Sequence, residues 1–101
     1  MMWRGTTPTH TFTLPDGIRF TDFEVIYLTY VQGGRTVLEK TKDELEATDD
    51  GFRLIFSQAD TLCFSPGPVS IQLRARFPDG RAVASGIIPT TAQEVLKDGE
   101  I

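Results

Sequence analysis

The residue types that carry out most protein catalysis are scarce in this sequence. His10 is the only histidine and Cys63 the only cysteine. A catalytic triad needs a nucleophile, a base and an orienting acid, and a zinc site needs three or four ligands. Strand alternation places His10 on the side of Phe12 and Leu14, so we expect a histidine whose ring nitrogen makes a structural hydrogen bond. The sequence therefore predicts no enzyme, no metal site and no cofactor.

Cys63 lies between two apolar residues, Leu62 and Phe64, in the stretch DTLCFSP. No histidine or lysine neighbours it that could activate the thiol, and Asp60 would oppose a thiolate. We therefore expect Cys63 to behave as a small buried apolar side chain. A single cysteine also excludes an intramolecular disulfide and a thiolate metal cage.

The stretch EKTKDELEATDDG, residues 39–51, combines six carboxylates with two lysines. Calcium loops are built from carboxylates, but the D-x-D-x-D-G spacing is absent here. Lysines interleaved with acids are typical of a solvated surface hairpin. The glycines at 33–34 and the PGP at 66–68 are turn signals, because no helix opens behind them to hold a phosphate.

Two arginines and a glutamine share one side of a predicted strand over 69–77. Arg81 lies just across the Pro78-Asp79-Gly80 turn, and Arg53 adds to this patch if its own strand is adjacent. Such a face is either solvated, with long polar stems covering the sheet, or a docking face for an acidic partner. The polar side comprises Ser70, Gln72, Arg74 and Arg76, and the apolar side comprises Val69, Ile71, Leu73, Ala75 and Phe77.

Turn signals recur at short intervals and separate runs of β-branched and aromatic residues with a period of two, which is typical of strands. Gly33-Gly34, Asp49-Asp50-Gly51 and Pro78-Asp79-Gly80 should each close a hairpin, because glycine supplies the positive φ of tight turns. Residues 1–101 should form one domain, an all-β, immunoglobulin-like antiparallel sandwich of about seven strands, with a small barrel as the alternative. We expect strands near 9–14, 22–32, 35–40, 44–48, 52–57, 69–77 and 81–88.

The strand at 22–32 is apolar on both sides, with Val25, Tyr27 and Val31 on one and Ile26, Leu28 and Tyr30 on the other. Either it lies centrally with both faces covered, or it presents one face to a partner. We expect the partner-binding residues to include Gln72, Arg74, Arg76, Arg81 and Tyr30.

The last residues, TTAQEVLKDGEI, allow two structures. Thr91 and Glu94 have the spacing of a capping box and Gly99 would end a short helix, but the same residues could continue the last strand as an extended arm.

Charge and hydropathy exclude several classes of partner. The formal net charge of -4 argues against general affinity for nucleic acid, which needs basic surface. The longest apolar stretch, FEVIYLTYV, is too short to span a membrane as a helix, and the first residues have no apolar run of a signal peptide. We expect a protein that is made in the cytoplasm and binds no membrane.

The later half of the sequence resembles small proteins of tailed phages and prophages of Gram-positive bacteria. Their pattern is a (T/S)Q-x-(D/E)-T-L-x-F segment, a strand with V-x-I-Q-x-R, a DG hairpin and a closing VL-x-x-G-x-I. The matching residues here are Ser57, Gln58, Asp60, Thr61, Leu62, Phe64, Val69, Ile71, Gln72, Arg74, Val95, Leu96, Gly99 and Ile101. The early TPTHTFTLP and the long strand FEVIYLTYVQGGRTVLEKT extend the resemblance over nearly the full length.

The resemblance implies a virion-type β-sandwich, similar to the N-terminal domain of upper baseplate proteins of siphophages, and brings no catalytic residues. Baseplate proteins continue into further domains, whereas this sequence ends at Ile101. We therefore expect a non-enzymatic structural or interaction protein, a tail, baseplate or other virion component made in a bacterial host. It would act through sheet-face or edge contacts with a protein partner or as a homo-oligomer.

The alternative function is a carbohydrate-binding β-sandwich module, which would present exposed aromatic side chains. Trp3, Tyr27 and Tyr30 are the only Trp and Tyr residues, and Trp3 lies at a terminus that we expect to be mobile.

Overall fold

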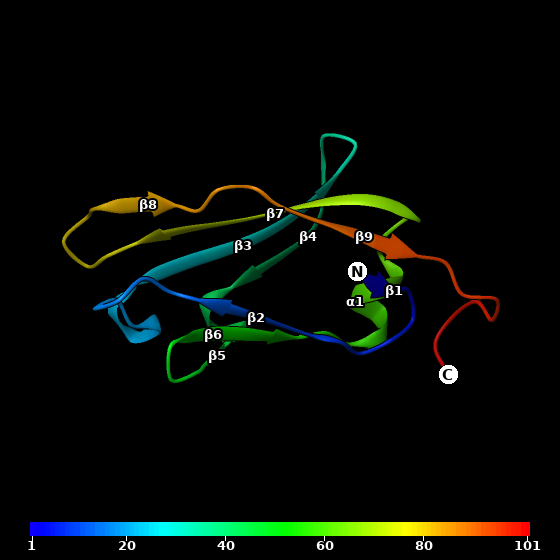
Figure 1. The fold of residues 1–101 in the computed structure, drawn as a ribbon, viewed down its shortest axis with the longest axis horizontal. Coiled ribbons are helices and arrows are strands. Elements are labelled where there is room, and N and C mark those ends of the chain that lie inside the picture. The colour runs from blue at the N-terminus through cyan, green and yellow to red at the C-terminus, as the bar shows by residue number, and fades with distance from the viewer.

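Two β-sheets pack face to face in the computed structural model, which describes residues 1–101 (Figure 1). The larger sheet has the order β1-β9-β7-β3-β4, and β8 pairs with β7 beside β9; the smaller sheet has the order β2-β6-β5. The larger sheet comprises β1 (Met2–Trp3), β3 (Val25–Gln32), β4 (Arg35–Thr41), β7 (Gly67–Arg76), β8 (Ala82–Ala84) and β9 (Ile88–Gln93). The smaller comprises β2 (Thr9–Thr13), β5 (Glu46–Ala47) and β6 (Gly51–Ile55).

The strand order confirms the immunoglobulin-like sandwich. In that fold, strands B, E and D belong to one sheet and C, F and G to the other, and variable-type domains add C′ beside C. Here β2-β6-β5 corresponds to B-E-D, β9-β7-β3 to G-F-C, and β4 takes the place of C′. The first strand, β1, pairs in parallel with β9, whereas all other strand pairs are antiparallel.

All three predicted hairpins form, but only two of them use glycine for a positive φ. Gly33 and Gly34 both have positive φ, 56° and 75°, as a two-residue turn between β3 and β4 requires. Gly80 has a φ of 93° between β7 and β8. Gly51, after the β5–β6 turn, has no positive φ; a Cβ there would overlap the carbonyl oxygen of Phe12 in the paired strand.

The predicted strand at 81–88 is instead two short strands, β8 and β9. Between them the Ser85 hydroxyl accepts a hydrogen bond from the Leu73 amide (2.9 Å), so a side chain replaces a backbone partner. β9 then continues to Gln93, beyond the predicted end, and Glu94 binds Arg4 at 2.5 Å. Thr91–Gln93 therefore continue the last strand, and the alternative of a helix at 91–98 is wrong. Beyond Glu94 the chain bends, and the Ile101 amide donates to the side chain of Gln58 in α1 at 2.8 Å.

Three short helical turns connect the strands: η1 (Phe20–Asp22), η2 (Lys42–Glu44) and α1 (Gln58–Leu62). No element was expected where α1 lies, although the helix begins with a clear capping box. The Ser57 hydroxyl accepts the Asp60 amide at 3.1 Å, and the Asp60 carboxylate accepts the Ser57 amide at 3.0 Å. The expected strand at 44–48 is reduced to β5 because η2 occupies its start.

The core lies between the two sheets and agrees with most of the predicted inward residues. Phe52, Leu54, Phe56, Val69, Ile71 and Ala75 are buried, whereas Phe12, Leu73 and Phe77 are partly buried at the margin. Cys63 was expected to be buried and is exposed, because it caps the C-terminal end of α1 at the surface. No helix is long and apolar enough to cross a membrane.

Candidate interaction face

The strand β3 lies between β7 and β4 in the larger sheet and turns one face to the core and one to solvent. Ile26, Leu28 and Tyr30 are at most 1% exposed, whereas Tyr27, on the opposite side, is 43% exposed. The sequence allowed β3 to have both faces covered or one face open to a partner. The structure shows that one face of β3 is uncovered.

The uncovered side of β3 meets the polar side of β7, and together they form what we call the Tyr27 face. The strand register places Val25 beside Arg76, Tyr27 beside Arg74 and Thr29 beside Gln72. The face therefore consists of Val25, Tyr27, Thr29, Gln72, Arg74 and Arg76, on the side of the larger sheet turned away from the smaller one (Figure 1).

Tyr27 stands between two hollows in this surface. The smaller, about 180 Å³, is bounded by Val25, Tyr27, Arg74, Arg76 and Ala82. The larger, about 500 Å³, extends to the other side of Tyr27, over Ile26 and Phe20 toward Thr41 and Asp43. An exposed tyrosine flanked by hollows offers a partner both a flat apolar ring and recesses for its own side chains.

The polar residues of the face differ in whether their side chains already bind other groups of the chain. Arg76 pairs with Glu24 at 3.3 Å, with both side chains about half exposed. Gln72 donates its amide to the carbonyl of Ser85 (2.9 Å) and so fixes the connection between β8 and β9. Arg74 makes no ion pair and no side-chain hydrogen bond. Arg74 is therefore the cationic group of this face that is free to bind.

Tyr30 does not belong to the face, which corrects the prediction. It is 0% exposed, and its hydroxyl lies 2.8 Å from Nδ1 of His10 inside the sandwich. Burial raises the pKa of the Tyr30 hydroxyl far above its ordinary value, so it stays protonated. The expectation that the His10 ring nitrogen makes a structural hydrogen bond is confirmed.

Arg81 and Arg53 also lie elsewhere. The Arg81 guanidinium stacks over the ring of Phe77 (4.6 Å to the centroid) and binds Asp79 at 2.7 Å. Phe77 packs toward the core, so Arg81 is on the opposite side of the sheet from Arg74. Arg53 belongs to β6 of the smaller sheet and pairs with Glu46 at 3.1 Å.

Sequence reasoning chose the wrong tyrosine, although one signal was present. Thr29 alternates with Tyr27, so the side of β3 that carries Tyr27 is the more polar of the two. A polar residue in the middle of a strand favours the solvent side. Counting Thr29 would have assigned Tyr30 to the core and Tyr27 to the surface.

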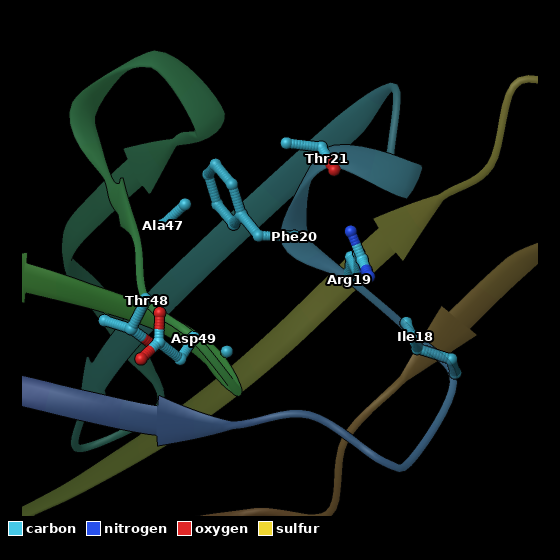
Figure 2. A pocket seen from close by; sticks show the side chains of 8 residues that line it. Ile18, Arg19, Phe20, Thr21, Ala47, Thr48 and Asp49 are labelled. Atoms are coloured by element: carbon cyan, nitrogen blue, oxygen red, sulfur yellow. The ribbon is translucent and has the colours of Figure 1, made fainter.

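A third, more polar pocket opens at the end of the sandwich, between the segment that leads into β3 and the β5–β6 turn. It has a volume of about 400 Å³. In Figure 2, Arg19 lies on one side of the opening, Thr48 and Asp49 lie on the other, and the Phe20 ring lies beside Ala47. Its lining residues are Ile18, Arg19, Phe20, Thr21, Ala47, Thr48, Asp49 and Gly51.

The carboxylates of residues 39–51 bind their neighbours. Glu44 accepts the Thr41 amide at 3.1 Å, and this bond together with Lys40 holds the pKa of Glu44 below its usual value. Lys40 also binds Asp60 at 3.1 Å, which joins β4 to α1. No group of three or more His, Cys, Asp or Glu side chains is placed to hold a metal ion.

Comparisons with protein-family models, curated proteins and solved structures find no match.

Proposed function

We propose that this chain is a non-enzymatic interaction protein that docks another protein on its Tyr27 face. The observation that carries the proposal is the half-exposed Tyr27 between two hollows, beside the unpaired Arg74. Tyrosine and arginine are enriched among the residues that contribute most to binding at protein interfaces, because each combines apolar area with polar recognition. An acidic group on the partner would supply the carboxylate that Arg74 lacks.

The proposed biological setting is the virion of a tailed phage or prophage, where such a sandwich would serve in a tail or baseplate. This setting is supported by the sequence resemblance alone. The residues that carry the resemblance act mainly in folding here: Ser57 and Asp60 cap α1, and the Thr61 hydroxyl donates to the carbonyl of Thr6 at 2.8 Å. Arg74 is the charged member of the pattern that makes no ion pair, and Leu96 and Ile101 are members whose apolar side chains are exposed.

The test is the solution mass of the purified protein, measured by light scattering across a concentration series. If copies of the chain are the partner, the wild type forms a discrete oligomer, and R74E and Y27A each shift it toward monomer. R53E is the matched control, because it makes the same charge change on an exposed arginine of the opposite sheet. Equal loss of the oligomer in R53E and R74E would contradict a role for the Tyr27 face.

A monomer at every concentration would exclude self-assembly through this face and leave a different virion protein as the partner. The same three variants then decide the question against purified tail and baseplate proteins encoded beside this gene. Binding that survives both R74E and Y27A would overturn the proposed face.

Glycan binding is a second candidate, because Trp3 is 47% exposed. Trp3 lies in β1, where it pairs with Gln93 of β9. Trp3 and Tyr27 share the outer side of the larger sheet, but the strand register places them about 26 Å apart along the strands. One sugar ring cannot contact both. A change in tryptophan fluorescence on titration with cell-wall polysaccharide would favour this function, and a flat titration would exclude Trp3 as a platform.

A further inference from the structure

The pocket in Figure 2 has one cationic and one anionic side chain in its lining, and these two side chains form no ion pair with each other. Arg19 and Asp49 both line it, from segments 30 residues apart in the sequence. Neither side chain takes part in any ion pair or side-chain hydrogen bond of the structure. Elsewhere exposed arginines with an acid nearby do pair, as Arg81 does with Asp79 at 2.7 Å.

The rest of the lining is suited to a small organic molecule. Phe20, which is 8% exposed, closes the inner wall, and Ile18 and Ala47 add apolar surface at the sides. Thr21 and Thr48 bring hydroxyl groups to the lining. The volume of about 400 Å³ lies in the range of small-molecule pockets in proteins.

We propose that this pocket binds a zwitterion of the α-amino-acid class. The guanidinium of Arg19 would receive the ligand carboxylate, because its planar fork matches two carboxylate oxygens. The carboxylate of Asp49 would receive the ammonium group, and an apolar side chain would lie toward Phe20. The ligand would thus give both Arg19 and Asp49 an oppositely charged group, which the chain itself does not provide.

The experiment compares three probes of nearly equal shape by amide chemical shifts in solution. L-valine carries both charges, L-valinamide only the cation and N-acetyl-L-valine only the anion. We expect L-valine to shift the amides of Thr21, Ala47, Thr48 and Gly51, and to bind about fivefold more tightly than either singly charged probe. Equal affinity for all three probes, shifts elsewhere on the molecule, or no shift with L-valine would overturn the proposal.

Two variants assign the charges to their residues. R19Q should bind L-valine no better than L-valinamide, and D49N should bind it no better than N-acetyl-L-valine. R35Q and D98N are matched controls, because both residues are exposed and lie outside the pocket. They should keep the full preference for the zwitterion. R74E should keep it as well, so the outcome is independent of the Tyr27 face.

Discussion

At the scale of single residues, the contact between His10 and Tyr30 shows how a buried polar pair is kept in an apolar core. The His10 ring is also packed edge-on against Phe56, with centroids 4.8 Å apart. Burial lowers the pKa of His10 below the ordinary value for histidine, because the charged imidazolium is poorly solvated there. Folding therefore favours the neutral form of His10.

A pH dependence of stability follows from this shift. The unfolded chain binds a proton on His10 at a higher pH than the folded chain, so the contribution of His10 is full above about pH 6.5 and is lost as the pH falls below it. Urea unfolding at about pH 7.5 and about pH 5 should show lower stability at the acid value. Glu44 and Asp60 also have lowered carboxyl pKa values, but the stability that these carboxylates contribute is lost only at a pH below this range.

His10→Gln is the variant that isolates this effect. Its free energy of unfolding should be nearly independent of pH between these two values, since no other histidine is present. If the variant keeps the full acid loss of the wild type, another group is responsible and the assignment to His10 is wrong.

Residue positions also show what alternation can predict and what it cannot. The inward side of β7 and β6 followed directly from their period of two, because each strand has one clearly polar side. β3 has two apolar sides, and which of them is covered depends on where the smaller sheet lies. The position of that sheet is a tertiary property, and Thr29, on the side of Tyr27, is the one local residue that points to it.

At the scale of elements, α1 is held by its N-terminal cap and by an ion pair to β4. The Ser57 cap orders Asp60, and Asp60 in turn binds Lys40 of β4 at 3.1 Å. Lys40 is only 15% exposed, so this ion pair is better shielded from solvent than the others on the surface. A helix of five residues has little intrinsic stability, and these contacts supply it.

Ser57→Ala should therefore lower the free energy of unfolding by about 1 kcal/mol, the usual cost of losing an N-cap hydroxyl. Ser70→Ala is the control, because Ser70 is an exposed strand serine, and its loss should stay within about 0.5 kcal/mol. Both are measured by urea unfolding. Equal losses in the two variants would mean that the capping box contributes nothing specific.

The element scale was also where the sequence was most and least informative. The three hairpins were predictable because their turns combine glycine, aspartate and proline between strands of regular spacing. The break between β8 and β9 was not, because it depends on a hydrogen bond from the Leu73 amide to Ser85 across the sheet. The residues after Gln93 are held by two contacts distant in sequence: Glu94 binds Arg4, and the Ile101 amide donates to Gln58 at 2.8 Å.

At the scale of the whole molecule, two electrostatic terms act on any assembly through the Tyr27 face. The net charge of -4 makes like copies repel, and salt screens that repulsion. Local attraction between Arg74 and an acidic group has the opposite dependence, since salt weakens it. The measured salt dependence of association therefore reports which of the two dominates.

We expect the local term to dominate for a complex seated on Arg74. Raising the salt from about 50 mM to about 500 mM should weaken the wild-type complex severalfold, because this change shortens the screening length from more than 10 Å to a few ångströms. In R74Q the complex should be weaker at low salt and should no longer lose affinity as salt rises. Both dependences are measured by light scattering for self-association, or by calorimetric titration for a different partner. A wild-type complex that tightens with salt would show that Tyr27 and the hollows beside it bind without help from Arg74, and the expectation of an acidic partner would then be wrong.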